Sequence, residues 1–273
     1  MVPQVATASA PITVVTGGSE GIGRAIAMRF ALAGHRVLLV ARDPRKLAEA
    51  AAAIRASTAM GGVANPTVDV LPLDICEPGA ADAIERHLAE AGGYAEILVN
   101  SAGIGLSGAF HDHSAEAINR LLALNVAALT RLMRHFLPGM RARHSGGVIN
   151  IASLGGTVPG PYQAVYYASK AYVISLSEAV ASEVAADGVR VTVVVPGPVA
   201  TGFHGRMGAE NSLYRRLLPA MAPETVARWA IFAYTLHLRL AVPGLINTVL
   251  FASLRILPHR IVIPVVTWLL RPR

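Results

Sequence analysis

The stretch I-T-V-V-T-G-G-S-E-G-I-G, residues 12 to 23, decides the fold class. Its first five residues form an apolar, β-branched run that is typical of a buried strand. The glycines that follow permit a tight turn and a close approach of a phosphate to bare backbone. A helical pattern begins at Ile22, and a helix N-terminus offers unpaired N–H groups and a favourable dipole. A strand, a Gly-rich turn and a helix in this order predict a dinucleotide-binding unit.

Apolar runs and helical stretches alternate through most of the chain. We predict strands at Ile12–Thr16, Arg36–Ala41, Thr67–Leu73, Ile97–Asn100, Gly147–Ile151 and Val189–Val195. Between them we predict helices at Ile22–Ala33, Pro44–Ala56, Gly79–Ala91, Ala115–Arg143 and Ala164–Ala186. Continuous apolar strands separated by helices indicate a parallel sheet that is covered on both faces. The sequence therefore predicts an α/β fold, a single Rossmann-type doubly wound sheet whose ligand crevice lies at the carboxyl ends of the strands.

Composition narrows the class of protein. The chain has 273 residues, of which 53% are hydrophobic and 15% charged, and this length suits one large domain. A single cysteine, Cys76, excludes an internal disulfide, so we expect a reducing cytoplasm. Residues 1–10 lack both a basic and an apolar region, and we predict no signal peptide. The net charge of +7 comes from scattered arginines, which argues against nucleic acid and suits an anionic cofactor or a membrane surface.

The residues after the second predicted strand bear on the choice of cofactor. Asp43 lies about twenty residues beyond the Gly-rich turn, where an acid often binds ribose hydroxyls, but Asp43-Pro44 fits a helix N-cap followed by proline. Ala41 ends the strand and Arg42 follows it. A guanidinium matches a 2′-phosphate in charge and geometry, so we predict a preference for NADP(H) over NAD(H).

Tyr166 and Lys170, in Y-Y-A-S-K, lie four residues apart and share a helix face. A neighbouring cation favours the phenolate, so we expect Lys170 to lower the pKa of Tyr166 from its usual value of about 10. Ser153, thirteen residues upstream, could hold a carbonyl oxygen while the phenol supplies or removes a proton. Y-x-x-x-K alone is common, and the surrounding motifs give it weight.

Those motifs, taken together, resemble the short-chain dehydrogenase/reductase family over about residues 11 to 235. In family order they are T-G-x-x-x-G-x-G at 16–23, Asp74, N-S-A-G at 100–103, Asn125 in L-N-V, Ser153, Tyr166, Lys170, and P-G-P-V-A-T at 196–201. Ser101 stands where the family usually has a second asparagine. Glu20 stands at a loop position that often carries a basic residue in NADPH-using members, which leaves Arg42 as the main expected contact to the 2′-phosphate.

The resemblance implies a role for each matching residue. Tyr166 is the expected proton donor or acceptor, Lys170 holds the nicotinamide ribose, Ser153 orients the substrate carbonyl, and Asn125 supports a water that links Lys170 to solvent. The implied cofactor contacts are Gly17, Ser19, Glu20, Gly21, Ile22, Gly23, Arg42, Asp74, Ile75, Asn100, Ala102, Gly103, Tyr166, Lys170, Pro196, Gly197, Val199 and Thr201.

The implied reaction is hydride transfer between the nicotinamide and a ketone or secondary alcohol, with no metal. His111 and His113, in H-D-H, are interpreted as part of a solvated turn rather than as ligands. An alcohol or hydroxysteroid dehydrogenase working in the oxidative direction is one alternative. A cofactor-binding regulator without turnover is another, which the intact Ser153, Tyr166, Lys170 and Asn125 argue against.

Two segments interrupt the alternation and bear on the substrate. We predict a Rossmann-fold catalytic domain over residues 11–243, with a substrate lid at 201–222, and an apolar helical extension over 244–273. We expect the extension to pack on the domain itself or on a partner subunit, or else to contact a membrane, with Arg255, His259, Arg260, Arg271 and Arg273 near lipid headgroups. Its ending loosely resembles that of the 3-ketodihydrosphingosine reductases and related long-chain ketone reductases. The family also implies a homodimer or homotetramer formed through the helices that carry Asn125 and Tyr166.

Overall fold

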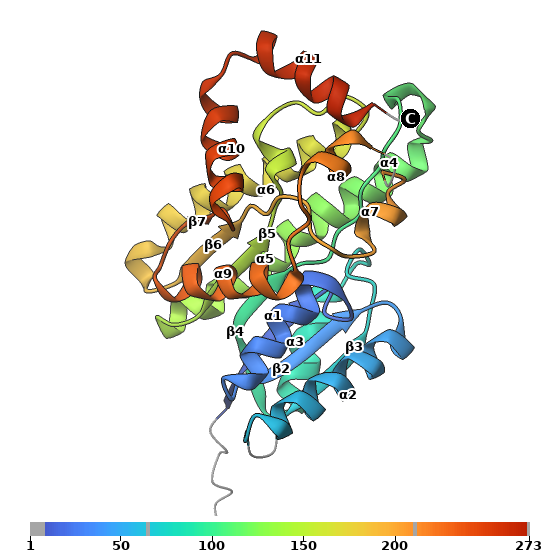
Figure 1. Ribbon diagram of the computed structural model, residues 1–273. Helices are drawn as coiled ribbons and strands as arrows, with labels where there is room; N and C mark the ends of the chain where they lie inside the picture. The colour runs from blue at the N-terminus through green and yellow to red at the C-terminus, as the bar shows by residue number, and fades with distance from the viewer. Residues whose placement is uncertain (1–8, 64–65, 210–211, 272–273) are drawn as a thin grey trace, which may run out of the picture.

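The computed structural model describes residues 9–63, 66–209 and 212–271. Two residues of the predicted lid, 210 and 211, and Arg273 of the predicted membrane contact lie outside the described residues. A seven-stranded parallel sheet with the order β3-β2-β1-β4-β5-β6-β7 runs through the centre of the protein (Figure 1). The strands are β1 (Ala10–Thr16), β2 (Arg36–Ala41), β3 (Val68–Pro72), β4 (Gly93–Asn100), β5 (Gly147–Ile151), β6 (Arg190–Val194) and β7 (Leu240–Ala241).

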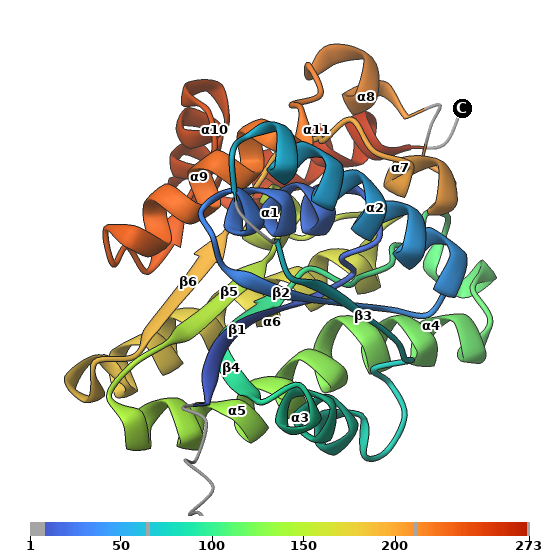
Figure 2. The same cartoon turned by 90° about the horizontal axis from the view of Figure 1, so that it is seen from below.

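Helices cover both faces of this sheet, and the doubly wound α/β fold is confirmed. On one face lie α1 (Gly21–Leu32), α2 (Pro44–Met60) and α9 (Pro223–Thr235); on the other lie α3 (Ala80–Glu90), α4 (Ala115–Leu122), α5 (Leu129–Arg143) and α6 (Ala164–Glu183) (Figure 2). The apolar strands are buried because both of their faces meet helices: Val14, Leu38, Leu98, Val148 and Val193 are at most 1% exposed.

The long helix predicted at Ala115–Arg143 contains an irregularity. Between α4 and α5, residues Ala123–Ala128 form a wider π-helical turn, labelled η2, and Asn125 lies within it. Apolar periodicity continues through this turn, so the sequence pattern predicts one uninterrupted helix. Single π turns inside α-helices are frequent at functional sites.

The chain beyond β6 folds mainly into helices, consistent with the predicted lid and extension. The lid segment holds two short helices, α7 (Phe203–Arg206) and α8 (Leu213–Leu217). The extension holds α10 (Leu245–Ile256) and α11 (His259–Leu270), which extend above the carboxyl ends of the strands (Figure 1). Within the described residues, no helix is long and apolar enough to cross a membrane.

Candidate active site

A cavity of about 630 Å³ lies at the carboxyl ends of the strands, where a doubly wound sheet places its ligand crevice. Five parts of the chain line it: the Gly-rich loop, residues 101–103, the segment around Ser153 and Tyr166, residues 196–201, and the predicted lid with the C-terminal helices. The predicted residues that line it are Gly17, Ser19, Glu20, Gly21, Ile22, Ala102, Gly103, Ser153, Tyr166, Lys170, Pro196, Gly197, Val199 and Thr201.

The Gly-rich loop is shaped to leave backbone exposed to a ligand. Gly17 and Gly21 have φ of +65° and +57°, a conformation that favours glycine. A Cβ on Gly17 would lie 2.9 Å from the Cα of Ala102, so only glycine lets the loop approach that segment. Gly23 does not line the cavity; a Cβ there would lie 2.4 Å from the Gly17 carbonyl oxygen. Gly23 therefore serves the packing of α1 against the loop.

The N-terminus of α1 is left free for an anion. Glu20 is its N-cap residue and makes no side-chain capping hydrogen bond, and the first turn contains no acid. The contrast is α2, where the Asp43 carboxylate accepts from the backbone N–H groups of Arg45 and Lys46 at 2.9 and 3.2 Å, which confirms that Asp43 is a helix cap. The bare loop and uncapped helix fit a dinucleotide pyrophosphate.

Four other predicted cofactor contacts lie outside the cavity lining: Arg42, Asp74, Ile75 and Asn100. Arg42 follows β2, and its Nη1 lies 3.8 Å from Oδ2 of Asp74, whose Oδ1 accepts from the backbone N–H of Cys76 at 3.0 Å. Ile75 is buried beside them. Asn100 is also buried and donates to the Asn150 carboxamide at 2.9 Å. Arg42, Asp74 and Ile75 thus gather beyond the loop, while Asn100 joins the ends of β4 and β5.

Three of the four residues in the catalytic prediction meet at the cavity. Tyr166 and Lys170, on α6, are 8% and 7% exposed, and the Lys170 Nζ lies 5.9 Å from the centre of the Tyr166 ring. The Ser153 side chain hydrogen-bonds the Tyr166 hydroxyl and accepts from the Gly155 N–H at 3.1 Å. Lys170 donates to the Ile151 carbonyl at 2.9 Å. Tyr166, Ser153 and Lys170 all face the cavity.

The expectation of a lowered pKa for Tyr166 is wrong for the protein in this state. Burial raises the pKa of Tyr166 to about 12, and the hydrogen bond from Ser153 only partly opposes the rise. Burial also lowers the pKa of Lys170 to about 8. The i, i+4 spacing predicts the proximity of the two groups, but burial decides the direction of both pKa shifts.

The Asn125 side chain does not line the cavity and is hydrogen-bonded to protein groups. Its Nδ2 donates to the Ile104 carbonyl at 2.8 Å and to Ser169 Oγ at 3.1 Å, and its Oδ1 accepts from the Ile104 N–H at 3.0 Å. Both of its amide protons are therefore occupied by protein groups. Asn125 is a positioning residue that fixes the π turn against the segment after β4. A Cβ on Gly103 would lie 3.3 Å from the Oδ1 atom of Asn125.

Lining residues that the motifs do not predict come from the lid and the C-terminal helices. The Tyr214 hydroxyl and the His204 Nδ1 lie 2.8 Å apart, and the Phe203 ring lies 5.5 Å from the Tyr166 ring. The apolar wall includes Leu250, Leu254, Val262, Val266 and Leu270. The apolar character of the C-terminal segment is visible in the sequence, but its position over the cavity depends on tertiary packing.

Two other groups of polar side chains, around His111 and around His135, lie outside the cavity lining. His111 is exposed and lies 3.4 Å from Asp112 in the turn before α4. Among the described residues, one group has the spacing of metal ligands: Asp82, Glu85 and His135 on the outer face of α3 and α5. Its two acids are exposed, and His135 lies 2.8 Å from Glu85 as an ion pair.

Comparison with known proteins agrees with the site. The family model for short chain dehydrogenases matches residues 11–212. An uncharacterized oxidoreductase of Staphylococcus saprophyticus is 34% identical over 224 residues, which cover 81% of this chain and 90% of that protein. A short-chain dehydrogenase from Sphingobium yanoikuyae, solved with NADPH, is 33% identical with a TM-score of 0.78 over 89% of this chain and 91% of that one.

A second solved structure adds a described substrate class. The bulky-bulky ketone specific alcohol dehydrogenase of Comamonas testosteroni is 29% identical with a TM-score of 0.73 over 88% of each chain. The residues that the family model matches include the Gly-rich loop as well as Ser153, Tyr166 and Lys170. This chain belongs to the short-chain dehydrogenase family.

Proposed function

We propose that the protein is an NADP(H)-dependent oxidoreductase that interconverts a hydrophobic, lipid-like ketone and its secondary alcohol. The observation that carries this proposal is the meeting of Ser153, Tyr166 and Lys170 in a cavity whose other wall is apolar. The bound nicotinamide would supply or accept the hydride. Gly17, Gly21 and the start of α1 would hold the pyrophosphate, and Arg42 would face the 2′-phosphate.

The protein groups would carry the proton and orient the carbonyl. The Ser153 and Tyr166 hydroxyls lie within hydrogen-bonding reach of each other, so a carbonyl oxygen that replaces their mutual hydrogen bond would meet two hydroxyl donors as negative charge develops on it. With a pKa of about 12 the Tyr166 phenol is protonated at neutral pH, the form that donates a proton to a carbonyl oxygen. Lys170, which is held by the Ile151 carbonyl, would bind the nicotinamide ribose.

Replacing Tyr166 with Phe tests this mechanism. The ring and its packing remain while the transferable proton is lost, so kcat for reduction of a hydrophobic ketone should fall at least about 100-fold. Binding of NADPH, followed by its fluorescence, should change little. Tyr162→Phe is the matched control because its ring lies outside the cavity lining. Unchanged turnover in Tyr166→Phe would refute the assignment, and NADPH binding without turnover of any ketone or alcohol would favour the regulator alternative.

Two observations support a hydrophobic substrate. The five apolar side chains of α10 and α11 named above line the cavity, and the Tyr167, Met207 and Phe203 side chains extend that lining. The related structure from Comamonas testosteroni is described as specific for ketones with two bulky groups. A ketone panel with increasing chain length should show kcat/KM rising with length. The oxidative alternative predicts that, at neutral pH, the alcohols turn over faster with NADP⁺ than the corresponding ketones do with NADPH.

We also propose that α10 and α11 contact a membrane surface. The exposed apolar side chains of these helices and of the turn between them are Leu245, Ile246, Val249, Ile256, Leu257, Ile261, Val265 and Trp268. Residues 225–273 contain arginines and histidines but no aspartate or glutamate. Apolar side chains beside cations fit an anionic lipid surface. Ile261 and Val265 also line the cavity, so a lipid-like substrate could enter from that surface.

Vesicle sedimentation separates this proposal from packing against a partner subunit. The protein should bind vesicles that contain phosphatidylserine, and Trp268→Ala should weaken that binding several-fold. Trp229→Ala is the control because Trp229 is also exposed but lies on α9. No vesicle binding, together with a smaller oligomer in Trp268→Ala, would show that the tail packs on a partner.

For the assembly we propose a homodimer or homotetramer formed through α4, α5 and α6. Leu122 and Tyr172, on α4 and α6, are 40% and 39% exposed, so an apolar surface is available there. Light scattering should give a mass of two or four chains, and Tyr172→Glu should lower it. A monomer in the wild-type protein would contradict the assembly without affecting the proposed reaction.

A further inference from the structure

The Gln163 side chain is a buried amide in the cavity wall. Gln163 is 3% exposed, lines the cavity and immediately precedes α6. Its backbone is fully used: the N–H donates to the Gly160 carbonyl at 3.0 Å, and the carbonyl accepts from the Tyr167 N–H at 3.0 Å. Its side-chain Nε2, in contrast, is buried and has no hydrogen-bond partner among the described residues.

The surroundings do not explain a polar side chain here. Val158, Tyr167 and Met207 line the same cavity, and an apolar side chain at position 163 would suit them. A buried amide donor without a partner lowers the stability of the folded protein, because its hydrogen bonds to water are lost and not replaced. Such a group in a binding cavity gains its partner when a ligand with a suitable oxygen occupies that cavity.

The position of Gln163 relative to Tyr166 limits where that oxygen can lie. Residues three apart at a helix share a face, with Cβ atoms about 5–6 Å apart. A substrate whose carbonyl meets Tyr166 and Ser153 would therefore place nearby carbons, a few bonds away, next to Gln163. The amide offers both a donor and an acceptor, and its terminal torsion is broad, so either end can turn toward a hydroxyl or carbonyl.

We propose that Gln163 is a specificity residue that hydrogen-bonds a second oxygen on the substrate. The substrate class is then a hydrophobic ketone or alcohol that carries a further hydroxyl or carbonyl a few bonds from the reacting carbon. This inference rests on the proposed oxidoreductase function and narrows its substrate. Gln163 takes no part in proton transfer, which belongs to Tyr166.

A matched set of ketones tests the inference. The set contains one aliphatic ketone and derivatives of it with a hydroxyl two, three or four carbons from the carbonyl, each assayed with NADPH. The wild-type protein should show, at one hydroxyl position, a kcat/KM about 10-fold above that of the parent ketone. In Gln163→Met, which keeps the length of the side chain, this ratio should fall to about one. In Met207→Leu, a cavity residue without hydrogen-bonding groups, the ratio should remain.

Thermal stability separates binding from a structural role. Because Nε2 has no protein partner, Gln163→Met should leave Tm unchanged or raise it. A lower Tm with equal losses on every ketone would show that the amide supports the fold, and it would overturn the inference. Equal ratios in wild type and Gln163→Met would overturn it while the proposed function stands. Failure of the wild type to turn over any of these ketones would overturn both.

Discussion

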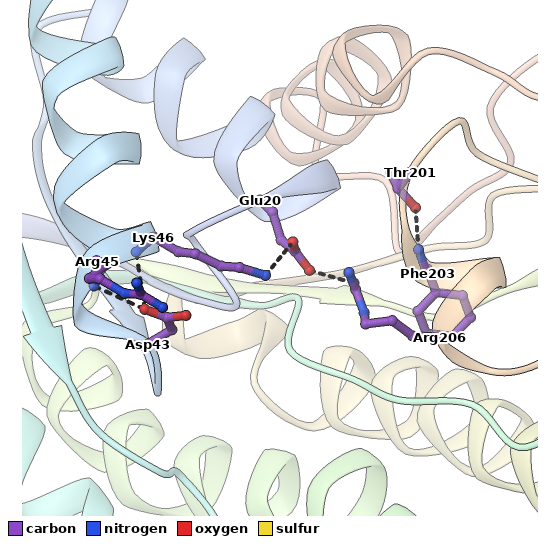
Figure 3. A network of polar contacts seen from close by, with 7 residues as sticks. All are labelled: Glu20, Asp43, Arg45, Lys46, Thr201, Phe203 and Arg206. Atoms are coloured by element: carbon purple, nitrogen blue, oxygen red, sulfur yellow. Dashed lines mark hydrogen bonds and ion pairs between the residues drawn. The ribbon is translucent and has the colours of Figure 1, made fainter.

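Glu20 of the Gly-rich loop forms an ion pair with Arg206 of α7, so one carboxylate joins the predicted cofactor loop to the predicted substrate lid. The same carboxylate lies 3.4 Å from the Lys46 Nζ at the start of α2, as Figure 3 shows. All three side chains are substantially exposed. Glu20 therefore holds two cations at the edge of the site where we expect the cofactor phosphates.

Removing this carboxylate should improve NADPH binding. In Glu20→Gln, Lys46 and Arg206 lose their acidic partner and an anionic group leaves the loop, so the KM for NADPH should fall about two- to fivefold. The effect should shrink at high salt because exposed charges are screened. Steady-state kinetics at varied NADPH checks it. Glu49→Gln, an exposed change of the same charge on α2, is the control; a higher KM in Glu20→Gln alone would contradict this prediction.

Arg42 should set the preference for NADPH over NADH. The Arg42 side chain is about half exposed, and its ion pair with the Asp74 carboxylate is long, at 3.8 Å. The guanidinium therefore remains available to a 2′-phosphate. Arg42→Ala should raise the KM for NADPH about 10-fold and leave the KM for NADH nearly unchanged. Arg86→Ala, on the far helix α3, controls for net charge. Equal turnover of both cofactors by the wild type would contradict the assignment.

Burial of Lys170 should make the stability of the protein depend on pH. The pKa of Lys170 is about 8 in the folded protein against its ordinary value of 10.5, so between these values the unfolded chain binds a proton that the folded protein lacks. The contribution of Lys170 to the free energy of unfolding should therefore rise with pH across this window, by about 3 kcal/mol. Below pH 8 the cost of its charge is fully present.

Urea unfolding of variants isolates this contribution. Lys170→Met should lack the rise, so its stability relative to wild type is greatest near pH 7 and declines toward pH 10. The chain has one other lysine, Lys46, which is exposed, and Lys46→Met should keep the wild-type slope. Parallel pH profiles for all three proteins would show that Lys170 is not titrating in this window.

Asn125 should matter more for stability than an ordinary surface asparagine. Its carboxamide makes three hydrogen bonds, to both backbone groups of Ile104 and to Ser169. Asn125→Ala leaves these buried partners unpaired and should lower the free energy of unfolding by about 2–4 kcal/mol. Asn119→Ala, on the exposed side of α4, should change it by less than about 0.5 kcal/mol. Equal effects of the two changes would exclude the proposed clamping of the π turn.

Local sequence patterns determined much of the framework. The β-branched run before Thr16, the Gly-rich turn and the Asp43-Pro44 cap are short-range signals, because turn conformation and capping depend on a few neighbouring residues. They predicted β1, the free N-terminus of α1 and the start of α2. The spacing of Tyr166 and Lys170 likewise fixed their shared face on one helix.

Tertiary structure decided the properties that depend on distant residues. The raised pKa of Tyr166 and the lowered pKa of Lys170 follow from burial, which no local spacing reveals. The π turn at Asn125 is fixed by Ile104, twenty-one residues away. Gln163 became a specificity candidate only because the fold encloses its amide without giving it a partner. The sequence by itself thus determined which groups could perform hydride chemistry, while packing decided their protonation and the shape of the site, because both depend on exclusion of water.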